Sequence, residues 1–334
     1  MSTKPIRVVS YGLGPIGLAV ARLAATKRRL QIVGAVDTDP ALEGRSLQEL
    51  AGAAAPADVV VSGDAADVFG RVAPDAILHC TSSFLPRIVD QLTQAAAAGV
   101  NVVSSAEELL VPDLQHPELA RTLHEAAVAG GATIVGTGIN PGFVLDLLPV
   151  IASSVCADVE RVRGVRVVDA ATRRGPLQRK VGAGLTAAEF AREQETGRFG
   201  HIGMRESVAL LGRALELELD DVQQTCDPVL AQHGIETAHA RVEPGQVAGI
   251  HNVGRGRRAG ELLVELDLKM YVGAPDPRDE VFLEGSAPLH VQFPGGIPGD
   301  VATAAMLVNT VAQVVTAEPG LKTVLDLAPA RRLR

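Results

Sequence analysis

The sequence predicts an α/β protein in two parts: a doubly wound parallel sheet first, then an α+β domain with a mostly antiparallel sheet. Over residues 1–136, short β-branched runs alternate with Ala- and Leu-rich helical runs, which is the pattern of right-handed βαβ units. Residues 160–292 instead contain longer segments of alternating polarity, which are typical of antiparallel strands. Aromatic residues make up only 3% of the chain, so the core is aliphatic, as in parallel sheets covered on both faces.

Six short apolar runs in the first half are predicted to be buried strands, with helices between them. The predicted strands are Ile6–Ser10, Gln31–Val36, Asp58–Val61, Ala76–His79, Asn101–Ser104 and Thr133–Val135. The predicted helices are Ile16–Lys27, Asp64–Arg71, Phe84–Ala98 and Pro117–Ala129. Because helical runs separate the strands, we expect the strands to lie parallel in one sheet.

The second half is predicted to contain a helix at each end and strands between them. One helix is expected from Pro141 to about Ser154, because proline suits a first helical turn, and another from Asp300 to Thr316. The predicted strands are Glu160–Val168, Gln246–Val253, Glu261–Tyr271, Val281–Glu284 and Pro288–Gln292, with residues 254–260 as a hairpin turn. We therefore expect one domain at 1–140, a second at 141–299, and a segment 300–334 whose helix packs back on the first domain.

Composition excludes several classes of protein. A formal net charge of −8, from 31 basic and 39 acidic residues, argues against a nucleic-acid-binding surface. Gly and Pro interrupt the charge-free stretches, so no membrane span is predicted. The N-terminal residues run straight into a predicted strand, so we expect no targeting segment. The cysteines, Cys80, Cys156 and Cys226, are too dispersed for a disulfide framework or a zinc site, so we expect a cytoplasmic protein with no metal.

A complete G-x-G-x-x-G motif follows the first predicted strand and opens a helix. It reads Gly12-Leu13-Gly14-Pro15-Ile16-Gly17. The first glycine permits a tight turn, the second lets backbone amides approach a pyrophosphate, and the third lets the helix pack closely on the strand. The helix N-terminus adds N–H donors and positive dipole. This context favours a Rossmann-type dinucleotide-binding domain over the alternative, a glycine-rich turn without a ligand.

The residue expected to bind the adenosine ribose is Asp37, twenty residues beyond Gly17 at the end of the second predicted strand. Its carboxylate can accept hydrogen bonds from both ribose hydroxyls of NAD and would repel the 2′-phosphate of NADP. The neighbouring Thr38 offers no positive charge to that phosphate, although nearby Arg45 keeps NADP open as a second choice. The alternative is that Asp37 is a solvated turn residue.

Two further segments are expected near the cofactor. Thr81, Ser82 and Ser83 follow the fourth predicted strand, at the carboxyl edge where such sheets bind ligands, and either line the cofactor or cap the helix from Phe84. Asn140 follows the sixth strand and either caps the next helix or binds the nicotinamide carboxamide.

An acidic pair, Glu107 and Glu108, ends the fifth predicted strand and is followed by aliphatic residues. A carboxylate against Leu and Val side chains has a raised pKa and can transfer protons near neutral pH. The alternative is an acidic pair that only stabilises a helix N-terminus. In the second domain, Lys180 is a candidate base or a solvated charge, and His201 a candidate pocket residue or a structural one.

These segments together resemble the 2,4-diaminopentanoate dehydrogenase family, which includes native amine dehydrogenases and shares its plan with dihydrodipicolinate reductase. The resemblance rests on Gly12–Gly17, Ser105–Pro112, Gly136–Asp146, Lys180–Phe190, Gly200–Ser207 and Gly295–Asn309. Its most specific parts are Ala106–Leu109, Gly136–Phe143, and Gly299–Ala305 with Asn309.

The resemblance implies an NAD(P)-dependent enzyme that oxidatively deaminates an amine and, in reverse, aminates a ketone with ammonia. It implies that Glu108, or as second choice Glu107, is the catalytic acid/base, and it adds Asn309 to the cofactor contacts. Phe143, Lys180 and His201 are expected around the substrate. Leu110-Val111 and Pro298 depart from the family pattern and favour a simple aliphatic amine or ketone over a diamino acid.

Two other functions stay open. One is a different imine or carbonyl reductase of the same plan, similar to dihydrodipicolinate reductase or homoserine dehydrogenase, in which Lys180 or His201 carries the proton. The other is a non-catalytic NAD-sensing protein. The flat sheet expected in the second domain suggests a homodimer.

Overall fold

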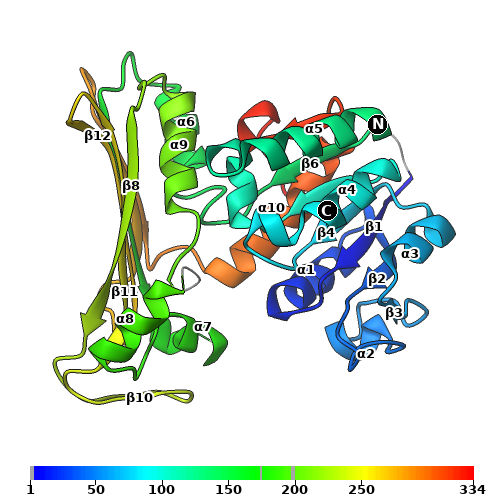
Figure 1. Cartoon of the computed structure of the whole chain (residues 1–334), viewed down its shortest axis with the longest axis horizontal. Coiled ribbons are helices and arrows are strands. Elements are labelled where there is room, and N and C mark those ends of the chain that lie inside the picture. Colours follow the sequence, from blue (N-terminus) through cyan, green and yellow to red (C-terminus); the bar gives the residue numbers. More distant parts are fainter. Residues whose placement is uncertain (1–3, 174, 197–199) are drawn as a thin grey trace. The chain divides into compact units, whose positions relative to one another are not determined.

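The computed structural model describes residues 4–173, 175–196 and 200–334, which form two units (Figure 1). Unit 1 contains the chain up to Phe143 together with Pro298–Arg334, and unit 2 contains Val144–Ile297. The chain therefore leaves unit 1, completes unit 2, and returns to unit 1. These contact boundaries lie a few residues from the expected 140/141 and 299/300.

Unit 1 is built on a fully parallel seven-stranded sheet in the order β15-β6-β5-β4-β1-β2-β3. Its strands are β1 (Ile6–Tyr11), β2 (Leu30–Val36), β3 (Val61–Ser62), β4 (Ala76–His79), β5 (Asn101–Ser104), β6 (Thr133–Gly136) and β15 (Gly320–Lys322). The strand order reverses between β1 and β4, and open α/β sheets bind ligands at such a point, outside the carboxyl ends of the strands.

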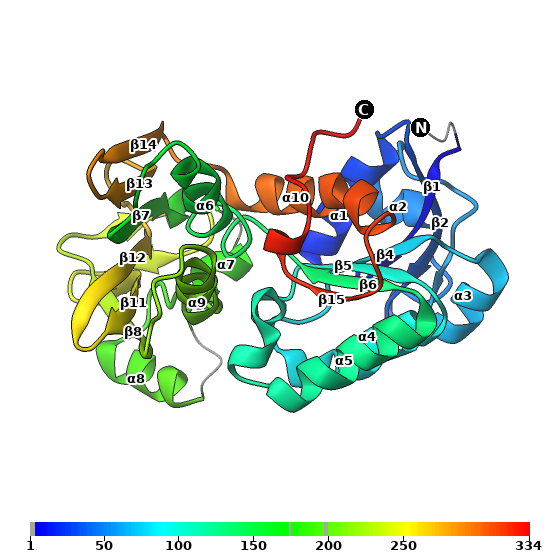
Figure 2. The same cartoon turned by 90° about the horizontal axis from the view of Figure 1, so that it is seen from above.

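Helices cover both faces of this sheet. They are α1 (Pro15–Ala25), α2 (Leu47–Ala51), α3 (Ala65–Val72), α4 (Val89–Ala97), α5 (Pro117–Gly130) and α10 (Gly299–Val314). Figure 2 shows α4 and α5 on one face and α1 and α10 on the other. Because both faces are covered, the central strands are apolar throughout: Val8, Val9, Ile77, Val102 and Val103 have no exposed surface.

Unit 2 is built on a mixed six-stranded sheet in the order β14-β13-β7-β12-β11-β8, in which only the β7–β12 pair is parallel. The strands are β7 (Arg161–Asp169), β8 (Asp221–Leu230), β11 (Val247–Arg258), β12 (Glu261–Tyr271), β13 (Arg278–Glu284) and β14 (Leu289–Pro294). The other elements are α6 (Leu147–Ser153), α7 (Gly175–Lys180), α8 (Ala187–Glu195), α9 (Met204–Ala214) and the short hairpin β9 (Ile235–Glu236) and β10 (Arg241–Val242). The predicted fold class is confirmed.

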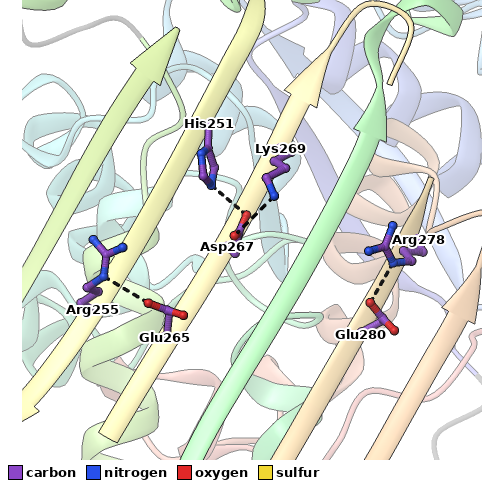
Figure 3. Close-up of polar contacts among 7 residues, drawn as sticks. All are labelled: His251, Arg255, Glu265, Asp267, Lys269, Arg278 and Glu280. Atoms are coloured by element: carbon purple, nitrogen blue, oxygen red, sulfur yellow. Dashed lines mark hydrogen bonds and ion pairs between the residues drawn. The ribbon is translucent and has the colours of Figure 1, made fainter. Parts of the chain in front are cut away.

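The two faces of the unit 2 sheet differ. On one, α9 approaches β11 so closely that a Cβ on Gly256 would lie 2.8 Å from Val208 Cγ1. The opposite face carries a ladder of charge pairs across β11, β12 and β13, shown in Figure 3. The pairs are Arg255–Glu265 (3.1 Å), His251–Asp267 (3.0 Å), Lys269–Asp267 (3.7 Å) and Arg278–Glu280 (2.8 Å).

Several expected elements differ from the observed ones. The helix expected from Pro141 begins only at Leu147, because Gly142 has φ 121°, outside the right-handed helical region, and Asp146 is the N-cap. The helix expected from Phe84 is a 3₁₀ turn, η1 (Leu85–Arg87), followed by α4. Residues 254–258, expected in a turn, continue β11, and the turn is confined to Ala259 and Gly260, both with positive φ.

Within the described ranges, no helix combines the length and the apolar surface that crossing a bilayer requires.

Candidate functional site

The glycine motif forms the tight connection between β1 and α1. Gly12 has φ 85°, and a Cβ there would lie 2.6 Å from the carbonyl oxygen of Cys80. A Cβ on Gly17 would lie 1.7 Å from the carbonyl oxygen of Gly12. Side chains are therefore excluded at both positions. The N-cap of α1 is Gly14, where a Cβ would meet only open space and no side chain caps the helix. This arrangement suits an anionic group at the helix N-terminus.

Asp37 is oriented toward this loop. Its Oδ2 accepts a hydrogen bond from the Leu13 amide at 2.6 Å, and its Oδ1 accepts one from the Asp39 amide at 2.9 Å. The Leu13 amide is thus engaged with Asp37, and the binding of a pyrophosphate by the motif stays a prediction. Thr38 is exposed, and Arg45 pairs with Glu49 at 3.6 Å on the surface.

The segment after β4 packs directly against the glycine loop. A Cβ on Gly12 would lie 2.8 Å from Thr81 Cγ2. Thr81 Oγ1 donates to Gln91 Oε1 at 2.8 Å and lies 2.9 Å from His79 Nε2. Ser82 Oγ accepts from the Phe84 amide at 3.3 Å. The 3₁₀ turn η1 and α4 have no side-chain cap, so the helix-capping alternative for residues 81–83 is wrong.

His79 is the buried centre of this polar network. Its Nδ1 lies 2.8 Å from Ser104 Oγ, its Nε2 lies 2.8 Å from Gln91 Oε1, and none of its surface is exposed. Burial lowers the pKa of His79 to about 4, so the imidazole is neutral near pH 7. His79 is predictable from the sequence as a strand residue but not as the centre of this network, because a lone histidine in an apolar run gives no signal of its partners.

Glu108 is buried at the carboxyl edge of the sheet, in the 3₁₀ turn η2 (Glu107–Leu110) that follows β5. Its amide donates to the Ser83 carbonyl at 3.2 Å. Its Oε2 accepts from the Leu85 amide at 2.7 Å and lies 3.3 Å from His116 Nε2. The carboxylate is therefore held between the segment after β4 and the turn before α5.

Glu107 lies beside Glu108 and is half-buried. Burial raises the pKa of the Cys80 thiol to about 12, and the Glu107 carboxylate contributes to this increase. Glu107 is thus close to the same segment after β4. Gly136, at the end of β6, lets η2 approach, because a Cβ there would lie 2.7 Å from the Leu109 carbonyl.

Asn140 and Phe143 follow β6 in unit 1, and both are half-buried. Asn140 does not cap a helix, since α6 begins seven residues later with Asp146 as its N-cap. Asn309, on α10, accepts a hydrogen bond from the Leu333 amide at 2.9 Å through Oδ1. Its amide oxygen therefore anchors the segment that follows β15.

The remaining predicted site residues belong to unit 2. Lys180 ends α7 and is exposed, and His201 precedes α9 and is half-buried. Burial lowers the pKa of His201 to about 3, and the positive charges of Lys180 and Arg166 contribute. The structure thus brings Lys180 and His201 together. A histidine with this pKa is a weak base, which disfavours the reading in which His201 carries the proton.

Comparison with known proteins assigns the chain to a family. Residues 143–333 match the model of the 2,4-diaminopentanoate dehydrogenase C-terminal domain. The chain is 29% identical to a 2,4-diaminopentanoate dehydrogenase from Acetoanaerobium sticklandii, over 98% of this chain and 95% of that one. The solved structure of an amine dehydrogenase from Mycobacterium smegmatis is similar with a TM-score of 0.86 at 29% identity, over 98% and 97% of the two chains.

A dihydrodipicolinate reductase from Paenisporosarcina sp. TG-14 shares the fold, with a TM-score of 0.54 at 12% identity over 94% of this chain and 96% of that one. The family model covers more than half of the chain. The resemblance seen in the sequence is therefore confirmed, and the chain belongs to the 2,4-diaminopentanoate dehydrogenase family.

Proposed function

We propose that this protein is an NAD(P)-dependent amine dehydrogenase, which oxidatively deaminates an amine and in reverse aminates a ketone or aldehyde with ammonia. The observation that carries the proposal is the buried carboxylate of Glu108, held against Ser83 and Leu85. The segment that begins at Cys80 and contains these two residues also packs on Gly12 of the dinucleotide motif. The segment after β4 therefore connects the proton-transfer group to the dinucleotide motif, because it contacts both. Family membership and the names of the relatives support the same activity.

In this proposal the cofactor is bound by the first unit. Asp37 accepts hydrogen bonds from the adenosine ribose, and the amides of Gly14 and Ile16 bind the pyrophosphate, since Pro15 has no N–H. Residues 81–83 and Asn140 would hold the nicotinamide, with Asn309 as a further contact. We propose NAD as the preferred cofactor, because the Asp37 carboxylate repels a 2′-phosphate.

Glu108 moves the protons of the reaction. When bound, the nicotinamide would supply the hydride acceptor for deamination and the hydride donor for amination. When ammonia adds to a ketone, Glu108 takes a proton from nitrogen and delivers one to oxygen, so that the carbinolamine loses water. The resulting iminium ion is stabilised by the negative charge of the Glu108 carboxylate.

Two features of the chain bear on the class of substrate. Leu110 and Val111 follow Glu108 and are buried, which supports an aliphatic amine or ketone without polar substituents. The positive charge of Lys180 beside His201 instead favours a substrate with a carboxylate. We keep Phe143, Lys180 and His201 as proposed pocket residues. Matched ketones with and without a carboxylate separate the two substrate classes.

The decisive experiment follows NADH absorbance at 340 nm with the purified protein, ammonia and a panel of ketones and aldehydes. Ammonia-dependent oxidation of NADH supports the proposal. Oxidation of NADH by a carbonyl compound without ammonia would support the alternative reductase, and NADH binding without turnover would support a sensing protein.

We also propose a cytoplasmic location, which the free thiols of all three cysteines support.

We further propose a homodimer that forms through the charged face of the unit 2 sheet. The ladder contains both signs in alternation, so a copy related by a two-fold axis can meet it with complementary charges (Figure 3). Light scattering at low and high salt tests the dimer. A monomer at every concentration would contradict it.

A further inference from the structure

The side chain of His116 extends the acid–base site of Glu108 toward solvent. His116 Nε2 lies 3.3 Å from Glu108 Oε2, and the two side chains are 28% and 9% exposed, respectively. The Glu108 carboxylate is thus enclosed, whereas the His116 imidazole is accessible to solvent. An imidazole can take up a proton and release it near neutral pH, which makes it suited to proton transfer.

The backbone holds His116 in place. The residue lies between the 3₁₀ turn η3 (Pro112–Leu114) and α5. Its amide donates to the Pro112 carbonyl at 3.1 Å, and its carbonyl accepts from the Ala120 amide at 2.9 Å. With Pro117 fixing the next φ, the backbone on both sides of the ring is constrained. The contact with Glu108 is therefore built into the start of α5.

The two oxygens of Glu108 have different surroundings. In the part of the chain that the structure describes, the contacts to the carboxylate come from Leu85 and His116, and both reach Oε2. Among the described residues, no hydrogen bond or ion pair reaches Oε1, so Oε1 is the oxygen that we assign to the substrate. A half-turn of the protonated carboxyl group about its Cγ–Cδ bond then brings the proton beside His116.

The balance of the proposed reaction requires such an exchange. An ammonium substrate, oxidised cofactor and water give a carbonyl product, ammonium, reduced cofactor and one proton. That proton must leave the site in every deamination and enter it in every amination. A buried carboxylate has little direct contact with water, so the rate of this exchange depends on its neighbour.

We propose that His116 is the proton-relay residue of this enzyme: it acts through Glu108, taking the proton from the carboxyl oxygen beside its Nε2 and passing it to solvent in deamination, and doing the reverse in amination. This inference rests on the proposed function, because it takes Glu108 as the group that exchanges protons with the substrate. It assigns no contact between His116 and the substrate.

The test compares two variants in the full-length protein. His116→Gln keeps an N–H donor that can reach Oε2 but cannot relay a proton, and His116→Phe removes both functions. Both variants should lower kcat by about tenfold or more, with the KM for the cofactor unchanged. Imidazole added to the buffer should restore much of the rate. His124→Gln is the matched control, because His124 is an exposed histidine on α5 that lies against Gly320 instead.

A second measurement needs no turnover. The ring ¹⁵N resonances of His116 should shift in Glu108→Gln and those of His124 should not; unshifted His116 resonances would remove the contact on which the relay rests. Wild-type turnover in both His116 variants would overturn the relay. A slow His116→Phe with a normal His116→Gln would also overturn it, because the N–H donor of glutamine would then be sufficient and positioning alone would explain the effect. Both results leave the proposed function intact as long as Glu108→Gln is inactive. A fully active Glu108→Gln removes the relay, and if Glu107→Gln is fully active as well, the proposed function falls with it.

Discussion

The Leu13 amide donates to Asp37 Oδ2 at 2.6 Å, so the second residue of the glycine motif and the acidic residue at the end of β2 are one hydrogen-bonded unit. The bond fixes the carboxylate beside the loop before any cofactor arrives. A preformed negative charge at this place binds ribose hydroxyls and opposes a 2′-phosphate.

Replacing Asp37 should therefore change cofactor preference. We expect the wild type to bind NAD more tightly than NADP, and Asp37→Ser to narrow the difference, by about tenfold for each 1.4 kcal/mol of repulsion removed. Fluorescence titration with both reduced cofactors measures it. Asp39→Ala, which removes a neighbouring exposed carboxylate, should leave the ratio unchanged. A wild type that strongly prefers NADPH would show that Asp37 does not have this role.

The two glutamates of η2 should differ in their effect on rate. Glu108→Gln keeps the size of the buried side chain but removes its charge and its proton acceptor, so turnover should fall by at least about 10²-fold. Glu107→Gln should cost much less, because Glu107 is more exposed than Glu108. Cofactor affinity should hardly change in either variant. If Glu107→Gln is the inactive one, the chemistry stands and the assignment within the pair is reversed.

The ion pair of Arg166 with Asp279 should dominate the electrostatic stability of unit 2. The two side chains are 3% and 1% exposed, lie 2.6 Å apart, and also bind the backbone of Ile297. Asp279→Ala strands a buried guanidinium and should lower the free energy of unfolding by about 3–5 kcal/mol. Urea denaturation measures the loss.

Two further variants control for that result. Glu265→Ala breaks the more exposed pair with Arg255 and should cost less than about 1 kcal/mol. The double variant Arg166→Met with Asp279→Leu replaces both charges by apolar groups, and it should recover most of the stability lost by Asp279→Ala. An Asp279→Ala variant as stable as the wild type would contradict the assigned role of this ion pair.

His79 should make the protein sensitive to mild acid. Its folded pKa of about 4 lies below the ordinary 6.5, so the unfolded chain binds the extra proton first as pH falls. The stabilisation from the neutral ring is complete above pH 6.5 and is lost between pH 6.5 and 4, to the extent of roughly 3 kcal/mol. The free energy of unfolding at pH 7 and 5 should differ less in His79→Gln than in the wild type. An equal difference in both proteins would mean that another group carries the effect.

The sequence was sufficient for those features whose cause is local. The glycine motif, Asp37 and the apolar runs of β1, β4 and β5 are each determined by residues within a few positions, and each was predictable. Four strands were not: β8, β15, and the two-residue strands β9 and β10. β8 is an edge strand with a polar sequence and an internal Pro228, which argues against a strand, and β15 has only three residues.

The polar contacts of the site were less predictable than its motifs. His79 reaches Ser104 on the neighbouring strand, and His116 reaches Glu108 through the turn before α5. Both contacts depend on the register of the sheet and on turn geometry, which residue spacing does not reveal. The sequence analysis could therefore single out the acidic pair but not the histidine beside it.

The return of the chain to unit 1 has a consequence for biosynthesis. β15 pairs with β6, and α10 packs on α1, yet more than 150 residues separate β6 from α10 along the chain. A ribosome therefore finishes all of unit 2 while the β6 edge of the first sheet is still uncovered. Unit 2 is continuous and can fold as soon as it emerges, whereas unit 1 begins first and is completed last. The nascent form of this protein therefore exposes an open parallel edge, the kind of surface that chaperones shield from aggregation.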